Sequence, residues 1–409
     1  MSFRLTLILL NVVALAVLAG VVVWRVVSLR RNQEPTPANL TPFLDDEGLE
    51  GRRLERALGW SLIFVLIVAV SLPVYFLVEP TRQVQAKDAF LERSVAQGAV
   101  LFADATSPVY NSAVSRVCAS CHGAKGEGGT APFVLQPEAD KCLEKKNQSN
   151  PDVPECLPKQ VAWTAPPLNT VLLRYDRDQV TQIISYGRPG TPMPAQGVIS
   201  GQGVLNEQSI NDLVNYLDSI QITSKEAEAI SKEAVTTYRD GAPTLVSDTR
   251  AALDAATEKL TTAQADGTST PKAIDELQTA VDTAQLQLDA ATEYADEVKG
   301  LSEGAILFRL NCARCHTKGW SSYDPTNIAL PPLSPQGGGA YGPNLRDGAT
   351  LLQFPGKAGK QGQFDWVAVG IPANQQYGKR GISSGRMPHF SALLTDDQIN
   401  KIVEYERNL

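Results

Sequence analysis

Two five-residue stretches of the chain carry the same reactive side chains. Cys118-Ala-Ser-Cys-His122 and Cys312-Ala-Arg-Cys-His316 each place two cysteines three positions apart, with a histidine directly after the second. This spacing is typical of haem c attachment, because two thiols bond the two haem vinyl groups and the adjacent imidazole binds the iron. The sequence therefore predicts two haem c groups. Their thioether bonds would come from Cys118, Cys121, Cys312 and Cys315, and their first iron ligands from His122 and His316.

Two other chemistries use a pair of closely spaced cysteines. A zinc site needs a second pair of Cys or His ligands, and a thioredoxin-like redox motif needs a βαβ context. Each alternative explains one copy of the motif more easily than both. Haem c explains both copies together.

The methionines supply a second regularity. The chain has three, and the first is the initiator. Met193 and Met387 each precede a proline, and each lies 75 residues after the first cysteine of its motif (193 − 118 and 387 − 312). A thioether favours ferrous iron when it ligates a haem, whereas its ordinary role is core packing. We predict Met193 and Met387 as the second iron ligands.

One histidine competes for the second iron. His389 lies two residues after Met387, and the chain contains three histidines in total. Because His122 and His316 belong to the attachment motifs, bis-histidine ligation at both haems is excluded within this chain.

Helical segments flank each motif. Gly-x-x-Leu-Phe precedes both, at 98–102 and 304–308. After Met193, apolar residues at helical spacing predict an amphipathic helix over 206–220. After Met387, Thr395 and Gln398 predict a capping box at the start of a second such helix.

With these elements in order, each unit resembles a class I cytochrome c domain, over roughly residues 90–222 and 300–409. The resemblance implies a mainly α fold in which a proline carbonyl orients the first iron ligand. Pro343 is the candidate in the second unit, and Pro132 or Pro167 in the first. The first unit departs from the family through an insertion at about 133–164.

Two further cysteines lie in this insertion. Cys142 and Cys156 are in a polar segment that contains no histidine, so it offers too few ligands for a metal. A disulfide between Cys142 and Cys156, closing a short surface loop, is the favoured interpretation.

The N-terminal region predicts a membrane anchor. Residues 5–24 and 57–78 form two apolar runs long enough to span a bilayer. A cleaved signal peptide is the alternative for the first run. The intervening loop holds most of the nearby basic residues, namely Arg25, Arg30, Arg31, Arg52, Arg53 and Arg56. The positive-inside rule therefore places this loop in the cytoplasm, and the N-terminus and haem domains on the extracytoplasmic side. Disulfides persist in that compartment.

An acidic segment separates the two units. Apolar residues from Ile274 to Val298 alternate in steps of three and four, which is a heptad seam, and Leu253 to Ala263 does the same. The turn signal at 267–271 predicts an antiparallel helical hairpin. Residues 245–299 hold eleven Asp or Glu and four Lys or Arg. The hairpin is either a solvated spacer or an acidic arm that docks a neighbouring subunit or a basic electron carrier.

The predicted organisation has four parts: a two-helix transmembrane anchor at 1–80, the first cytochrome c domain at 88–222, the hairpin at 223–299 and the second cytochrome c domain at 300–409. The net charge of −7 and the absence of a basic stripe exclude nucleic-acid binding.

Two haems without an open coordination site indicate electron transfer rather than substrate chemistry. The chain resembles the dihaem cytochrome c subunit of a quinol-oxidising cytochrome bc-type respiratory complex. That resemblance implies an iron–sulfur protein and cytochrome b as partner subunits, and a terminal oxidase as electron acceptor. A cytochrome c subunit of the oxidase itself is the second interpretation. A dihaem peroxidase or dehydrogenase, or its electron-accepting subunit, is a third and would need a labile ligand or a catalytic partner.

Overall fold

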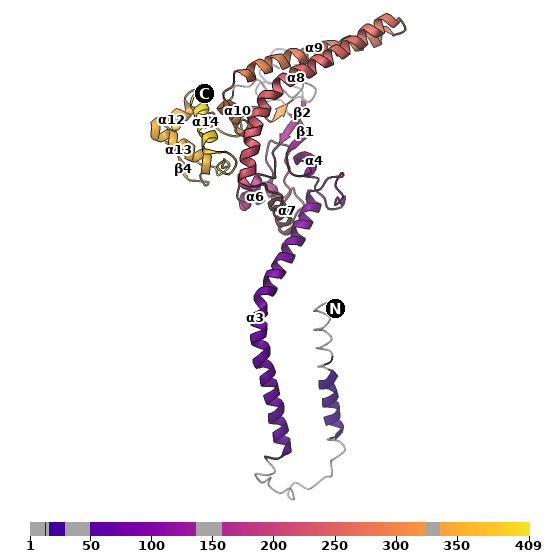
Figure 1. The fold of residues 1–409 in the computed structure, drawn as a ribbon, viewed down its shortest axis with the longest axis vertical. Helices are drawn as coiled ribbons and strands as arrows, with labels where there is room; N and C mark the ends of the chain where they lie inside the picture. The colour runs from indigo at the N-terminus through magenta and orange to yellow at the C-terminus, as the bar shows by residue number, and fades with distance from the viewer. Residues whose placement is uncertain (1–12, 14–15, 29–49, 136–157, 324–335) are drawn as a thin grey trace. The chain divides into compact units, whose positions relative to one another are not determined.

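The computed structural model describes residues 13, 16–28, 50–135, 158–323 and 336–409 of the 409-residue chain (Figure 1). The chain divides into two compact units, Met1–Gln85 and Ala86–Leu409, and each is described by itself. The described part of the chain is mainly helical.

One described helix is long and apolar enough to cross a membrane. This helix, α3, covers Arg52–Phe102, and its apolar part has no buried residues. Large side chains such as Trp60, Phe64 and Leu77 are exposed along it. A shorter apolar helix covers Ala16–Ser28. The first predicted membrane run, 5–24, lies partly outside the described residues, so one of the two predicted spans has a matching helix.

The second unit contains two apolar cores. The part of the chain around each core is called a lobe and is defined by its residues. The first lobe, 86–222, includes the end of α3. Its other elements are α4 (Ala119–His122), β1 (Gly129–Leu135), β2 (Lys159–Ala165), η3 (Val171–Leu173), α6 (Arg177–Tyr186), η4 (Val198–Ser200) and α7 (Glu207–Ser219). Its core contains Leu101 and Phe102 of α3 and Val214 and Leu217 of α7.

The second lobe, 300–409, is built around α10 and α14. Its elements are α10 (Glu303–Asn311), α11 (Ala313–His316), β3 (Ser322–Tyr323), α12 (Ala349–Gln353), α13 (Gly356–Val369), β4 (Gln376–Tyr377), β5 (Gly381–Ile382) and α14 (Asp396–Arg407). Ile306, Leu307 and Phe308 are fully buried.

The repeated Gly-x-x-Leu-Phe segment forms the same helix crossing in both lobes. A Cβ atom added at Gly98 would lie 2.1 Å from Asp212 O of α7, and one added at Gly304 would lie 2.2 Å from Lys401 O of α14. Four residues on from each glycine, Phe102 packs on Tyr216 and Phe308 on Tyr405, with ring centroids 5.2 and 5.3 Å apart. Glycine is needed because the two backbones touch.

The helices predicted after each methionine are confirmed. Helix α7 begins directly after Asn206, whose side chain accepts a hydrogen bond from Ser209 N. Helix α14 begins after Thr395, and Thr395 and Gln398 form the predicted capping box. Its apolar residues Ile399, Ile402 and Val403 are fully buried.

The insertion in the first lobe forms an antiparallel strand pair, β1 with β2. The opposite edge of β2 pairs with β3 of the second lobe, so that Ala162 faces Tyr323 and Trp163 faces Ser322. The three-stranded sheet has the order β1-β2-β3, and the insertion therefore joins the lobes. Cys142 and Cys156 lie outside the described residues.

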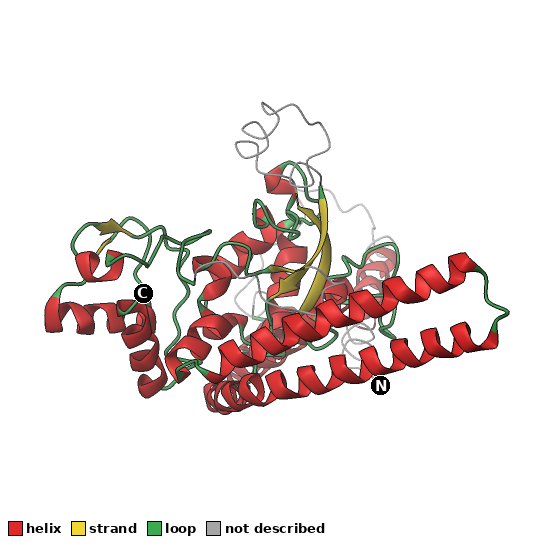
Figure 2. Cartoon of the chain, turned by 90° about the horizontal axis from the view of Figure 1, so that it is seen from above, coloured by secondary structure: helices red, strands yellow, loops and turns green. Residues whose placement is uncertain are grey.

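The acidic segment forms a helical hairpin of α8 (Ser224–Asp266) and α9 (Pro271–Lys299), which run side by side in Figures 1 and 2. Every predicted seam position from Ile274 to Val298 is buried or half-buried. Helix α8 begins at Ser224, well before Leu253, the first predicted seam residue. Thr223 and Glu226 form a capping box at this start.

The base of the hairpin packs into the second lobe. Ala227 and Val235 of α8 belong to the same buried core as Phe308. Arg309 of α10 is 4% exposed and pairs with Glu297 of α9. The first turns of α8 are therefore part of this lobe and not of a detached arm.

The glycine crossing leads to a testable expectation. We expect Gly304→Ala to lower the free energy of unfolding by about 1–3 kcal/mol, because the added methyl group overlaps the α14 backbone. Gly300→Ala is the matched control, since its added Cβ would lie 3.6 Å from the nearest atom. Denaturant unfolding of both variants, followed by circular dichroism, measures the difference. Equal midpoints would show that α10 and α14 can separate without loss of stability.

Candidate haem c sites

Both attachment motifs fold as the same single helical turn. His122 N donates to Cys118 O and His316 N to Cys312 O, each at 3.0 Å. The second cysteine of each motif also donates its N–H to the carbonyl of the first, at 3.2 Å in α4 and 3.0 Å in α11. Residues three and four apart on a helix share a face. Each motif therefore presents its two thiols and its imidazole on one side.

The first imidazole is fixed by a proline carbonyl. His122 is 8% exposed, and its Nδ1 donates to Pro166 O at 2.9 Å. The prediction of Pro132 or Pro167 for this role is wrong. Pro132 pairs with Ala162 inside the β1–β2 ladder, and Pro167 O accepts from Arg174 instead.

The second imidazole has the same arrangement. His316 is 7% exposed, and its Nδ1 donates to Pro343 O at 3.0 Å, as the sequence predicts. Gly342 lies against the ring: an added Cβ would be 2.5–2.8 Å from three ring atoms. A histidine whose Nδ1 donates to a carbonyl keeps Nε2 as the nitrogen that can bind a metal.

The surroundings keep both imidazoles neutral. Burial lowers the pKa of His122, and the charges of Arg314 and Arg174 lower it further. Burial also lowers the pKa of His316. Neutral imidazole is the form that ligates iron.

Three of the motif thiols have raised pKa values. Burial raises the pKa of Cys118 to about 11, and it also raises the pKa values of Cys312 and Cys315. A reactive thiolate needs a lowered pKa, so burial disfavours a thioredoxin-like role for these three thiols.

The two candidate methionines lie in loops that hydrogen bonds shape. Met193 is half-buried, Thr191 Oγ1 accepts from its N–H at 3.2 Å, and its carbonyl accepts from Arg188 N at 3.1 Å. Met387 is half-buried against the second core. His389 is the alternative candidate for the second iron. Its backbone N–H donates to Arg174 O of the first lobe at 3.3 Å.

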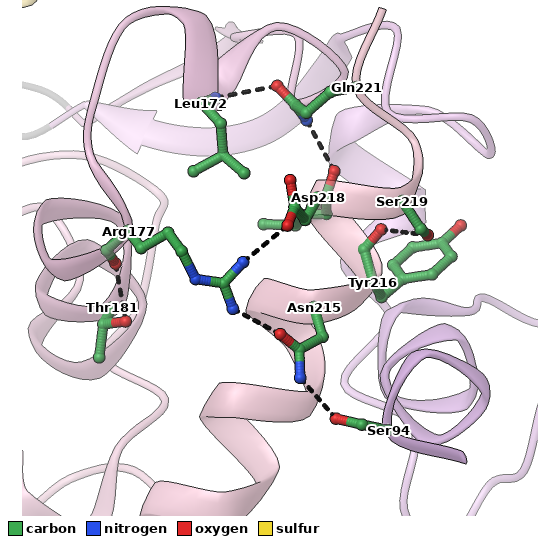
Figure 3. Close-up of polar contacts among 10 residues, drawn as sticks. Ser94, Leu172, Arg177, Thr181, Asn215, Tyr216, Asp218, Ser219 and Gln221 are labelled. Atoms are coloured by element: carbon green, nitrogen blue, oxygen red, sulfur yellow. Dashed lines mark hydrogen bonds and ion pairs between the residues drawn. The ribbon is translucent and has the colours of Figure 1, made fainter. Parts of the chain in front are cut away.

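A polar network that the sequence did not indicate fixes the helices around the first site (Figure 3). Arg177 of α6 pairs with Asp218 of α7 at 2.9 Å and also donates to Asn215. Asn215 in turn donates to Ser94 of α3 at 2.8 Å. Three helices are joined in this way, and the partners are 38 to 121 residues apart in sequence.

The two sites face a shared interface. Arg314, between the cysteines of the second motif, donates to Thr164 O of the first lobe at 2.9 Å. Tyr341, two residues before Pro343, donates to Gly190 O in the Met193 loop at 3.0 Å. Gln179 of α6 donates to Gly385 O in the Met387 loop at 3.2 Å. Each methionine loop thus touches the opposite lobe.

The residues present fit haem c. Both motifs place two thiols beside a buried, neutral imidazole whose Nδ1 is already occupied. At the second site, the absence of a side chain at Gly342 leaves the space that the His316 ring occupies.

Gly342 provides a test of the second site. We expect Gly342→Ala to displace the imidazole of His316, because the added methyl group cannot fit beside the ring. The low-spin electron paramagnetic resonance signal of one haem should shift while that of the other stays. Gly362→Ala is the control, since Gly362 lies inside a helix and its added Cβ would come no closer than 3.7 Å to another side chain. A spectrum unchanged in Gly342→Ala would contradict this contact.

Comparisons with known proteins agree with the two sites. A family profile for cytochrome c matches residues 95–221. A profile for subunit III of cbb3-type cytochrome c oxidase matches residues 300–405. Neither the curated proteins nor the solved structures gave a match. The chain therefore carries two cytochrome c domains, which imply haem c binding.

Proposed function

We propose that the chain is a dihaem electron-transfer subunit of a membrane respiratory complex. The observation that carries the proposal is the pair of equivalent motif turns, each with a buried histidine held by a proline carbonyl, in two lobes that contact each other.

The residues that would attach the haems and bind their irons are those predicted from the sequence. Cys118, Cys121, Cys312 and Cys315 would hold the two haems covalently, His122 and His316 would bind the irons from one side, and Met193 and Met387 from the other. A bound haem c supplies a one-electron ferric–ferrous couple.

The protein's own contribution is to keep each site rigid and dry. Phe102 and Phe308 are 2% and 0% exposed beside the motifs, and the imidazoles are fixed by their Nδ1 hydrogen bonds. Rigid ligands and excluded water reduce the reorganisation that accompanies a change of charge. No proton or bond has to move, which suits an electron conduit.

The proposal includes a membrane anchor. Helix α3 supports one span, and the apolar run at 5–24 would supply a second. With the arginine-rich loop in the cytoplasm, both lobes would lie on the extracytoplasmic side.

Two kinds of complex are candidates. The arrangement of an anchor and two cytochrome c domains resembles the dihaem subunit of a quinol-oxidising cytochrome bc-type complex, which would pass electrons to a terminal oxidase. The match of residues 300–405 to a cbb3-type oxidase subunit favours the second candidate, a cytochrome c subunit of the oxidase itself.

The axial ligands can be tested individually. We expect Met193→Ala and Met387→Ala each to remove the sulfur–iron charge-transfer absorption of one haem and to lower its potential, because a thioether favours ferrous iron. His389→Ala is the matched control for Met387→Ala and should leave the spectrum unchanged. If His389→Ala alters the second haem and Met387→Ala does not, then His389 is the ligand.

Purification from the native membrane tests the function. We expect the chain to copurify in mild detergent with cytochrome b and an iron–sulfur protein, or with oxidase subunits, and to be reduced and reoxidised during turnover. Carbon monoxide should leave its reduced spectrum unchanged, because neither iron has an open position. A carbon monoxide shift in a chain that purifies alone would favour a dihaem enzyme instead.

A further inference from the structure

Two arginines lie where the sites meet. Arg174 follows η3 of the first lobe, and Arg314 is part of the second attachment motif. Arg174 donates to Pro167 O at 2.5 Å, and Arg314 donates to Thr164 O at 2.9 Å. Pro166, between these two acceptors, holds His122. Both guanidinium groups therefore lie at the first site, and one of them belongs to the second motif.

Neither charge is neutralised among the described residues. The side-chain hydrogen bonds of Arg174 go to the carbonyl oxygens of Pro167 and Thr170, and that of Arg314 goes to Thr164 O. No Asp or Glu in the described ranges forms an ion pair with either one. Burial lowers the pKa of Arg174 to about 10, so its guanidinium stays charged near neutral pH.

Hydrogen bonds and chain position connect this pair to the second site as well. The carbonyl of Arg174 accepts from His389 N, two residues after Met387, at 3.3 Å. Arg314 itself lies between the two cysteines of the second motif.

We propose that Arg174 and Arg314 form a cation pair between the two haem sites, which favours the ferrous state of the haems. The inference rests on the proposed function. A haem carries one more positive charge when ferric than when ferrous, and nearby cations in a poorly screened interface disfavour the extra charge. Because both guanidinium groups donate to the backbone at 164–167, the effect is larger at the first haem.

The test removes each charge and keeps the fold. In Arg174→Gln and Arg314→Gln, we expect the reduction equilibrium of the first haem to shift about tenfold toward the ferric state, which is ~59 mV for one electron. Arg174→Lys and Arg314→Lys should keep most of the wild-type potential. Spectroelectrochemical titration of the full-length protein in detergent gives both potentials.

Two controls separate charge from structure. Lys360→Gln removes a cation whose charge Glu404 already balances, so the potentials should not move. Thr170→Asp places a carboxylate next to Arg174 without deleting it, and should lower the first potential where Thr170→Asn does not. This variant keeps the test valid if an Arg→Gln variant fails to fold.

Three results are decisive. Unchanged potentials in the Gln variants and in Thr170→Asp, with both haem spectra intact, would overturn the cation pair. Equal shifts in the Lys and Gln variants would assign the effect to the hydrogen bonds and also overturn it. A wild-type chain without covalent haem would refute the proposed function itself.

Discussion

The backbone at 164–167 accepts hydrogen bonds from three side chains that the chain brings from distant positions. Thr164 O binds Arg314, Pro166 O binds His122, and Pro167 O binds Arg174. The same stretch ends strand β2, which pairs with β3. The orientation of the His122 imidazole and part of the contact with the second lobe thus depend on the position of four residues. Two adjacent prolines suit this role, because they fix the backbone and have no N–H that needs a partner.

The lobes share a design and differ in how they use it. Both have a glycine at the helix crossing, a Phe–Tyr pair with tilted rings and a histidine held by a proline carbonyl. The first lobe adds the β1–β2 insertion, which provides the edge for docking. The second lobe instead incorporates the start of α8 into its core. The first lobe thus packs on the second lobe through its insertion, whereas the second lobe packs on α8. The two sites therefore have the same motif but different surroundings.

The sequence predicted features that depend on local spacing. The Thr395–Gln398 cap and the apolar face of the helix that it starts follow from residues within one or two helical turns. Pro343 was identified from the resemblance of its surroundings, Tyr-Gly-Pro-Asn-Leu, to the cytochrome c family. Pro166 was missed because it is adjacent to Pro167, and spacing cannot choose between them. Arg314 gave no signal, since its partner is 150 residues away.

The hairpin seam makes the length of this element adjustable. Its contacts repeat every seven residues, and seven helical residues rise about 10 Å. Adding or removing one heptad in both α8 and α9 would keep every apolar side chain on the seam. The contacts of Glu297 and Val235 with the second lobe lie at the base of the hairpin and would not change. Related chains can therefore differ in the reach of this arm in steps of one heptad, while the cytochrome core that carries it stays the same.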